Sequence, residues 1–217
     1  MDKLSKYYCN NDILEIGVDE VGRGPMFGRV YTAAVILPKD DNFNHYLMKD
    51  SKRFHSKKKI KEVAKYIKEN SLYWSVSWCS EDDIDKINIL NATIKSMHSS
   101  INDIINNDLS KKYLLMIDGN YFKPLTIFKD DTIKQIPYIC IKGGDNKYTC
   151  IAAASIIAKV ERDNYIDELI NNNIELNEKY DILNNKGYGT KKHIEGIKKY
   201  GICNYHRKTF GICKHYL

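Results

Sequence analysis

The chain has 217 residues, with 34 lysines and arginines against 28 aspartates and glutamates, which gives a formal net charge of +6. This length is sufficient for one α/β domain with a sizeable core, and the positive charge is compatible with a polyanionic partner. The six cysteines show neither a C-x-x-C pair nor the Cys/His spacing of a zinc site, which indicates reduced thiols. No apolar run approaches the length of a membrane span, and the N-terminus lacks the apolar segment of a signal peptide. We therefore expect a cytoplasmic protein with no membrane partner.

Hydrophobic periodicity predicts strands and helices along most of the chain. Leu14, Ile16 and Val18 recur at period two, which is typical of a strand with one buried face. Ser56 and Ser80 precede helical patterns and are the expected N-caps. The predicted strands lie at residues 14–18, 30–37, 72–79, 113–117 and 136–141, and the predicted helices begin at Ser56, run from Ser80 to about Ile105, and cover residues 148–160.

The C-terminal part of the chain has a helical pattern that is interrupted once, at Gly187–Thr190. Two or three helices are expected there. The sequence contains no Ser/Gly linker, no repeat and no low-complexity block. We therefore expect one α/β domain over residues 1–217, in which residues from about 175 form a C-terminal helical extension.

Acidic side chains stand where predicted strands end. They are Asp19, Glu20, Asp118 and Asp145. The ends of neighbouring strands converge in an open α/β sheet, and buried carboxylates are very costly unless a cation neutralises them. Magnesium prefers a few carboxylates, and two such ions clamp the attacking and leaving oxygens of a phosphodiester. The pattern indicates a two-metal phosphodiesterase centre, although each acid taken alone is more typical of a turn or a solvated strand end.

A glycine turn and two basic clusters accompany these acids. In Gly22-Arg23-Gly24-Pro25, the glycines remove side chains where a backbone could approach a phosphate or a sugar. Lysines and arginines concentrate at residues 52–61 and 186–208. Two basic patches on either side of an acidic centre suit a polyanion that is bound through its backbone. For either patch alone, a solvated lysine-rich surface is an equally good interpretation.

Several short motifs together resemble the type 2 ribonucleases H, the ribonuclease HII family. The matching blocks are Gly17–Pro25, Asp50–Lys52, Asn88–Thr93, Ile117–Asn120, Lys142–Lys159, Gly187–Thr190 and His206–Phe210. They stand in the order of the family and cover roughly residues 13–210. The resemblance implies a ribonuclease H-like fold with a central mixed five-stranded sheet that is flanked by helices.

The resemblance also implies an activity. It implies a metal-dependent endoribonuclease, with Mg²⁺ or Mn²⁺, that hydrolyses the RNA strand of RNA/DNA hybrids. It further implies incision 5′ of ribonucleotides embedded in duplex DNA, which leaves 3′-hydroxyl and 5′-phosphate ends. The implied catalytic and metal-binding residues are Asp19, Glu20, Asp118 and Asp145. We expect a monomer, and no protein partner is indicated.

The family reads the ribonucleotide with a glycine motif and a tyrosine, which here correspond to Gly22, Arg23, Gly24 and Tyr188. The 2′-hydroxyl is the group that distinguishes RNA from DNA, so backbone amides and an aromatic platform are suitable readers. Without the resemblance, Tyr188 would be interpreted as a packed loop aromatic. Basic side chains are expected to contact phosphates and to fix the register of the substrate. These are Lys52, Arg53, Lys191, Lys192 and Arg207.

The sequence departs from the family pattern before Asp145. The block Lys142-Gly143-Gly144-Asp145 has one glycine more than usual, so we expect a slightly different position for this carboxylate. The interval from Asp118 to Asp145 is long for the bacterial branch of the family, and it contains Asp130 and Asp131. We interpret these two residues as solvated loop acids that compete only weakly for the metal role.

Two other functions use similar features. A non-catalytic nucleic-acid-binding module would share the fold and the basic surface, but it would gain nothing from carboxylates placed against phosphates. Another DNA nuclease of the ribonuclease H fold, such as an integrase, would share the acidic cluster. The combination of Gly22-Arg23-Gly24 with Gly187–Thr190 disfavours that second alternative.

Overall fold

The computed structural model describes residues 3–9, 12–51, 54–129 and 131–216. The strands are β1 (Leu14–Val21), β2 (Val30–Ile36), β3 (Tyr73–Cys79), β4 (Tyr113–Asp118), β5 (Thr126–Lys129), β6 (Thr132–Gln135) and β7 (Tyr138–Ile141). The α-helices are α1 (Lys57–Asn70), α2 (Glu81–Ile105), α3 (Thr149–Asn171), α4 (Ile174–Tyr180), α5 (Ile182–Asn185) and α6 (Lys191–Tyr200). Short 3-10 helices are η1 (His45–Leu47), η3 (Gly144–Asn146) and η4 (Gly211–Tyr216).

The central sheet is mixed and has five strands in the order β3-β2-β1-β4-β7. Strand β2 is antiparallel to β1 and β3, whereas β4 is parallel to β1 and β7 is parallel to β4. Because Val18 pairs with Ile117, the carboxyl ends of β1 and β4 lie at the same edge of the sheet. This arrangement confirms the predicted fold class, and it places Asp19 and Asp118 in neighbouring strands.

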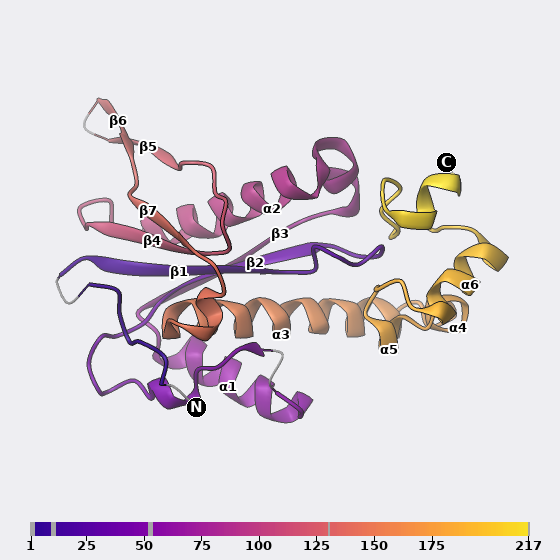
Figure 1. Cartoon of the computed structure of the whole chain (residues 1–217), viewed down its shortest axis with the longest axis horizontal. Helices are drawn as coiled ribbons and strands as arrows, with labels where there is room; N and C mark the ends of the chain where they lie inside the picture. Colours follow the sequence, from indigo (N-terminus) through magenta and orange to yellow (C-terminus); the bar gives the residue numbers. More distant parts are fainter. Residues whose placement is uncertain (1–2, 10–11, 52–53, 130, 217) are drawn as a thin grey trace.

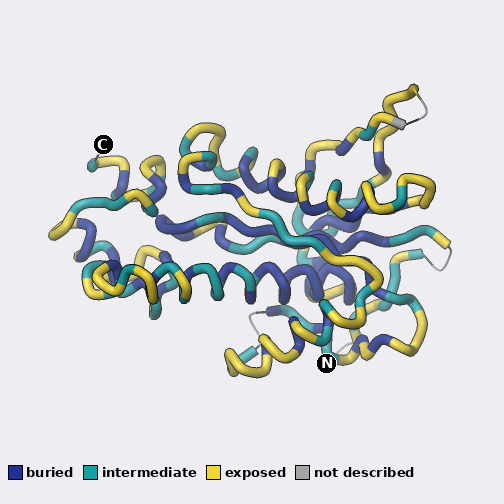
Figure 2. The backbone as a smooth tube through the Cα atoms, turned by 180° about the vertical axis from the view of Figure 1, so that it is seen from behind, coloured by how far each residue is buried: buried dark blue, intermediate teal, exposed yellow. Residues whose placement is uncertain are grey.

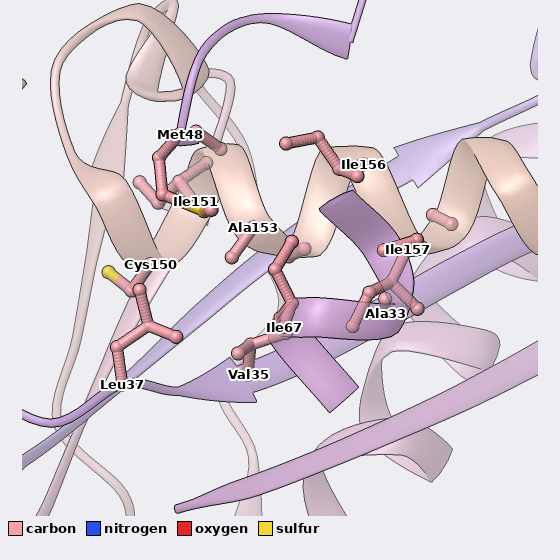
Figure 3. Close-up of a cluster of buried hydrophobic side chains, with 14 of the residues drawn as sticks. Ala33, Val35, Leu37, Met48, Ile67, Cys150, Ile151, Ala153, Ile156 and Ile157 are labelled. Atoms are coloured by element: carbon pink, nitrogen blue, oxygen red, sulfur yellow. The ribbon is translucent and has the colours of Figure 1, made fainter. Parts of the chain in front are cut away.

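Helices cover both faces of this sheet (Figure 1). Helix α2 lies on one face, where its Ile101 shares a buried cluster with Ile16 and Val18. On the other face lies α3, which in turn packs against α1. Side chains from β2, α1 and α3 fill that second core, as Figure 3 shows for Val35 and Ile67.

The alanine-rich stretch of α3 presses closely onto β1. A Cβ atom built on Gly17 would lie 2.3 Å from the carbonyl carbon of Cys150, so the strand and the helix are in backbone contact here. Small residues permit this approach, as the alanine run of the sequence indicates. The contact fixes the position of α3 relative to the strand that carries Asp19 and Glu20.

The C-terminal helices pack at the far end of α3 (Figure 1). Helices α4 and α6 share a buried cluster with Met26 and Phe27, which belong to the loop between β1 and β2. Strands β1, β2 and β4 are mainly buried, whereas β3 and β7 are mostly partly buried or exposed. Figure 2 shows exposed residues on the outer turns and along the β5–β6 hairpin. Among the described residues, no helix is both long and apolar enough to span a lipid bilayer.

Several elements differ from the predicted ones. Strand β7 begins at Tyr138 rather than at residue 136, because Pro137 has no N–H group for the ladder. The β5–β6 hairpin was not predicted and occupies the long interval before Asp145. Helix α3 continues to Asn171, well beyond residue 160. Helix α2 is interrupted at Asn88, which has φ 64° and ψ 163° and whose side chain accepts a hydrogen bond from the Asn91 N–H.

The close contact of β1 with α3 predicts that Gly17→Ala destabilises the protein. The added methyl group must displace the backbone of α3, and overpacking of this kind costs about 1–3 kcal/mol. Urea denaturation measures the change in the free energy of unfolding. Gly143→Asn is the control, because a Cβ atom there meets nothing within 4 Å and asparagine tolerates the left-handed conformation of Gly143. Equal stability of Gly17→Ala and the wild type would contradict the proposed backbone contact.

Candidate active site

Asp19 lies near the end of β1 and is buried, with 5% of its surface exposed. Its Oδ1 atom accepts a hydrogen bond of 2.7 Å from the backbone N–H of Glu20. The Ser155 side chain, on α3, also bonds to Asp19, and it lies 3.1 Å from the hydroxyl of Ser51. Glu20 accepts a hydrogen bond of 3.2 Å from the guanidinium of Arg23. Both acids are therefore anchored by specific neighbours at the sheet edge.

Asp118 ends β4, and its Oδ1 atom accepts a hydrogen bond of 2.6 Å from the Gly144 N–H. The additional glycine of this block makes the turn possible, because Gly143 has a left-handed conformation with φ 64°. Asp145 follows directly and is buried, and its Oδ1 atom accepts a hydrogen bond of 3.0 Å from the Asn146 side chain. The backbone that carries Asp145 thus lies against the carboxylate of Asp118.

The carboxylates of Asp19, Glu20 and Asp118 are close enough to influence one another. Burial raises the pKa of Asp19 well above its usual value, and the charges of Glu20 and Asp118 raise it further. Burial also raises the pKa of Glu20, against the opposing effect of the Arg23 guanidinium. Buried like charges of this kind are stabilised by any cation that approaches them.

The same side chains are at present engaged with protein partners. In the described ranges, no three His, Cys, Asp or Glu residues are arranged as a ready group of metal ligands. Asp118 bonds to Gly144, Glu20 to Arg23 and Asp145 to Asn146. The donor set consists of carboxylate oxygens, which suit a hard divalent cation. A cation would compete for these oxygens with the present hydrogen-bond donors.

Arg207 shapes the loop that follows β1. Its side chain has no exposed surface, and it donates hydrogen bonds of 2.6–3.1 Å to the carbonyl oxygens of Gly22, Arg23, Pro25 and Gly28. Burial and the nearby Arg162 guanidinium lower the pKa of Arg207 to about 9, so it remains charged at neutral pH. This placement contradicts the predicted phosphate contact, because a fully buried guanidinium cannot reach a substrate.

A second buried arginine supports the same loop from α3. Arg162 donates hydrogen bonds to the carbonyl oxygens of Phe27, Arg29 and Lys186, at 3.1–3.2 Å. A Cβ atom on Gly22 would lie 2.4 Å from its Nε atom, so the loop and the guanidinium fit together only with glycine at this position. Two cations thus bind the loop through its carbonyl oxygens.

With the carbonyl oxygens turned inward, the loop presents a different group to the outside. In the part of the chain that the structure describes, the N–H groups of Arg23 and Gly24 donate no hydrogen bond to another protein group. A Cβ atom on Gly24 would lie 3.3 Å from the Tyr188 ring, and Tyr188 is 48% exposed. The structure therefore brings Gly22–Gly24 and Tyr188 together in one wall, as the resemblance implied.

The other predicted contact residues lie farther out or outside the described residues. Lys191 and Lys192 are exposed in the first turn of α6, with side-chain exposures of 89% and 75%. Lys52 and Arg53 lie outside the described residues, as does Asp130. Asp131 is exposed in the turn of the β5–β6 hairpin, in agreement with a solvated loop acid.

Sequence reasoning missed Arg162 and Ser155. Both lie in α3, where Arg162 stands four residues before Ile166 on the buried face of the helix. A charged residue in an apolar helical row was a usable signal for Arg162. The alanine run around Ser155 gave no such signal, because serine is a common small residue at close helix–strand contacts.

Comparison with known proteins identifies the family. The family model described as Ribonuclease HII matches residues 16–213. The chain belongs to the ribonuclease HII family. The ribonuclease HII of Phocaeicola vulgatus is 40% identical over 207 residues, which cover 94% of this chain and 92% of the relative.

Solved structures share the fold at lower identity. The ribonuclease H2 of Pyrococcus horikoshii has a TM-score of 0.68 at 20% identity, over 94% of this chain and 97% of that chain. Bst-RNase HIII, in a complex with Mn²⁺, has a TM-score of 0.70 at 18% identity, over 94% of this chain and 69% of that chain.

Membership of the ribonuclease HII family identifies the chain as an endoribonuclease with ribonuclease H activity on RNA/DNA substrates. It argues against both alternatives from the sequence, the non-catalytic binding module and the DNA nuclease of another ribonuclease H-fold family.

The hydrogen bonds of Arg207 predict a structural role that its exposed neighbour Lys208 does not share. Arg207→Met leaves the four loop carbonyl oxygens without their donor, and we expect a loss of about 3–5 kcal/mol in the free energy of unfolding. Lys208→Met, at an exposed position, should change it by less than about 0.5 kcal/mol. Urea denaturation of both variants makes the comparison, and equal stability would refute the role of Arg207.

Proposed function

We propose that this ribonuclease HII uses a divalent cation to incise duplex DNA on the 5′ side of an embedded ribonucleotide, and also cleaves the RNA strand of continuous hybrids. The observation that carries the proposal is the position of three acids at one sheet edge. The buried Asp19 and the partly buried Glu20 lie near the end of β1, which leads into the Gly22–Gly24 loop, and the partly buried Asp118 lies at the end of the neighbouring β4. Asp19 and Glu20 thereby stand directly before the Gly22–Gly24 loop in the chain.

The cation site would be formed by Asp19, Glu20 and Asp118, with Asp145 completing it. Their mutual repulsion and burial favour a cation at this place, and Bst-RNase HIII, which has the same fold, is known in complex with Mn²⁺. A bound Mg²⁺ or Mn²⁺ would stabilise the negative charge that develops on the scissile phosphate. The carboxylates would also orient the attacking water for in-line displacement, which leaves 3′-hydroxyl and 5′-phosphate ends.

Recognition of the ribonucleotide would use the wall formed by Gly22–Gly24 and Tyr188. The N–H groups of Arg23 and Gly24 are suited to donate to a 2′-hydroxyl oxygen, because the loop carbonyl oxygens are already bonded to Arg207. The exposed ring of Tyr188 would stack at the junction between RNA and DNA. Lys191 and Lys192 would contact phosphates of the flanking duplex and add affinity without reading sequence.

A direct experiment tests this proposal. The protein is incubated with a DNA duplex that carries one ribonucleotide, with an all-DNA duplex as the control, in Mg²⁺, Mn²⁺ or EDTA. We expect one nick 5′ of the ribonucleotide in either metal, and none in EDTA or in the control duplex. Cleavage that persists in EDTA would reject the metal mechanism. A continuous RNA/DNA hybrid is cleaved in parallel, and cleavage of this hybrid without cleavage of the duplex that carries one ribonucleotide would reject the reading of single ribonucleotides.

The acidic site predicts that Asp118→Asn lowers kcat by at least about a hundredfold, because a carboxylate that binds the cation is lost. Independently of activity, Mn²⁺ at a hundred times its Kd should stabilise the wild type by about 2.7 kcal/mol and the variant much less. Asp131→Asn is the matched control, since Asp131 is an exposed acid outside the site. If both substitutions had the same effect on the stabilisation by Mn²⁺, Asp118 would not be a ligand of the cation.

The wall predicts a selective effect of Tyr188→Ala. Loss of base stacking should lower kcat/KM on a single embedded ribonucleotide by about five- to a hundredfold. A continuous hybrid should be affected less, because it offers neighbouring 2′-hydroxyls and alternative registers. Tyr188→Phe retains the ring and should behave like the wild type. An equal loss on both substrates would reduce Tyr188 to general positioning.

A further inference from the structure

Two buried histidines, His193 and His206, connect Cys203 to Tyr188 through hydrogen bonds. The Nε2 atoms of His193, on α6, and His206 lie 3.1 Å apart, and both residues have at most 1% of their surface exposed. At one end, Nδ1 of His193 lies 2.9 Å from the carbonyl oxygen of Tyr188. At the other end, Nδ1 of His206 lies 3.0 Å from the backbone nitrogen of Cys203.

The partners at the two ends determine where the protons lie. The Cys203 thiol sulfur also lies 3.2 Å from Nδ1 of His206. The Cys203 N–H can only donate, and the thiol, whose pKa is raised by burial, can donate as well, so Nδ1 of His206 accepts and its Nε2 carries the proton. That proton is donated to Nε2 of His193, which must therefore carry its own proton on Nδ1. The Tyr188 carbonyl oxygen can only accept, and it receives this last hydrogen bond. Both rings are neutral, and the chain of hydrogen bonds has a single direction, from Cys203 to Tyr188.

An additional proton does not fit this arrangement. A charged ring at either position would place two N–H groups against each other, or one N–H group against the Cys203 N–H. Burial lowers the pKa of His193, and burial together with the neighbouring imidazole lowers that of His206 to about 3.

Among the residues that the structure describes, no carboxylate faces the pair to favour a charged ring. Tyr180 of α4 faces both rings, burial raises its pKa to about 12, and its hydroxyl donates to the Gly201 carbonyl oxygen. Phe27 packs against both rings from the loop after β1. Burial raises the pKa of the Cys203 thiol, and the charged side chain of Arg207 is bonded to the loop carbonyl oxygens.

The consecutive residues His206 and Arg207 thus act on the two parts of the wall, Tyr188 and the glycine loop. Arg207 binds the carbonyl oxygens of Gly22 and Arg23, whereas His206 acts through His193 on the main chain of Tyr188. The gap between Gly24 and the Tyr188 ring allows no added methyl group without displacement, so a small shift of either half changes the wall.

We propose that His193 and His206 are positioning residues that set the place of Tyr188 against the glycine loop, and that selectivity for a single embedded ribonucleotide depends on this hydrogen-bonded pair. The proposal rests on the function proposed above for Tyr188. It assigns the two histidines no contact with the substrate.

The proton positions provide a test that needs no substrate. In ¹⁵N-histidine NMR spectra of the wild type, with peaks assigned from His193→Asn and His206→Gln, we expect the Nδ1–H tautomer for His193 and the Nε2–H tautomer for His206. Both rings should remain neutral from pH 8 to about pH 5. The opposite tautomers, or a charged ring at pH 7, would overturn the relay whatever the role of Tyr188.

Two substitutions of His193 separate positioning from stability. Asparagine places an amide nitrogen near the Nδ1 position and retains the bond to Tyr188, whereas glutamine reaches toward His206 and loses that bond. We expect His193→Gln to lower kcat/KM on a single ribonucleotide by about two- to tenfold, with a smaller change on continuous hybrid and for His193→Asn. His98→Asn, which removes an imidazole bonded to the Lys123 carbonyl oxygen, is the control.

A double-mutant cycle decides whether the histidines act through Tyr188. In a Tyr188→Ala background, His193→Gln should have no further selective effect, because the ring that it positions is absent. An undiminished effect in that background, or equal losses for His193→Asn and His193→Gln on both substrates, would overturn the proposal. Failure of Tyr188→Ala itself to alter selectivity would instead reject the proposed role of Tyr188, with the tautomer result unaffected.

Discussion

The bonding of a buried guanidinium to backbone carbonyl oxygens is the constraint on which the wall of Gly22–Gly24 and Tyr188 depends. Within the described residues, the Arg207 side chain donates to backbone carbonyl oxygens and not to a carboxylate, and four carbonyl dipoles of the loop after β1 satisfy its charge. A buried charge is tolerated only when its donors are all well placed. The loop is therefore fixed with its carbonyl oxygens inward, and the N–H groups of Arg23 and Gly24 are left for a ligand.

The acidic edge of the sheet depends on backbone geometry in a similar way. The parallel pairing of β1 with β4 brings Asp19 and Asp118 to one edge, and the Gly143–Gly144 turn places an N–H group against Asp118. In this structure, protein N–H groups therefore donate hydrogen bonds to the carboxylates. Arg23 links the two halves of the site, because it pairs with Glu20 while its backbone belongs to the loop.

The sequence predicted those parts of the molecule whose signals are local. Alternation predicted the strands of the central sheet, and strand ends followed by acids predicted Asp19, Glu20 and Asp118 as neighbours. The β5–β6 hairpin was not predicted from the sequence because its strands are short. Apolar residues such as Phe128 and Ile133 are exposed there, so the strands have no buried face that alternation would indicate. The phosphate contact predicted for Arg207 was wrong because the sequence pattern of a basic segment does not distinguish a buried arginine from an exposed one. Its partners are backbone carbonyl oxygens far away in the chain, and the residues next to Arg207 in the sequence do not indicate them.

The distance along the chain between the parts of the wall has a consequence for protein synthesis. Gly22 and Arg207 are 185 positions apart, and the loop acquires its donors only when the last part of the chain has emerged. During translation, the strands that carry the acids can assemble well before the element that shapes their recognition loop. In a nascent chain, Asp19 and Asp118 are therefore synthesised well before the arginine that bonds to the carbonyl oxygens of Gly22 and Arg23. On the function proposed above, the order of synthesis would delay substrate recognition until Arg207 reaches the loop.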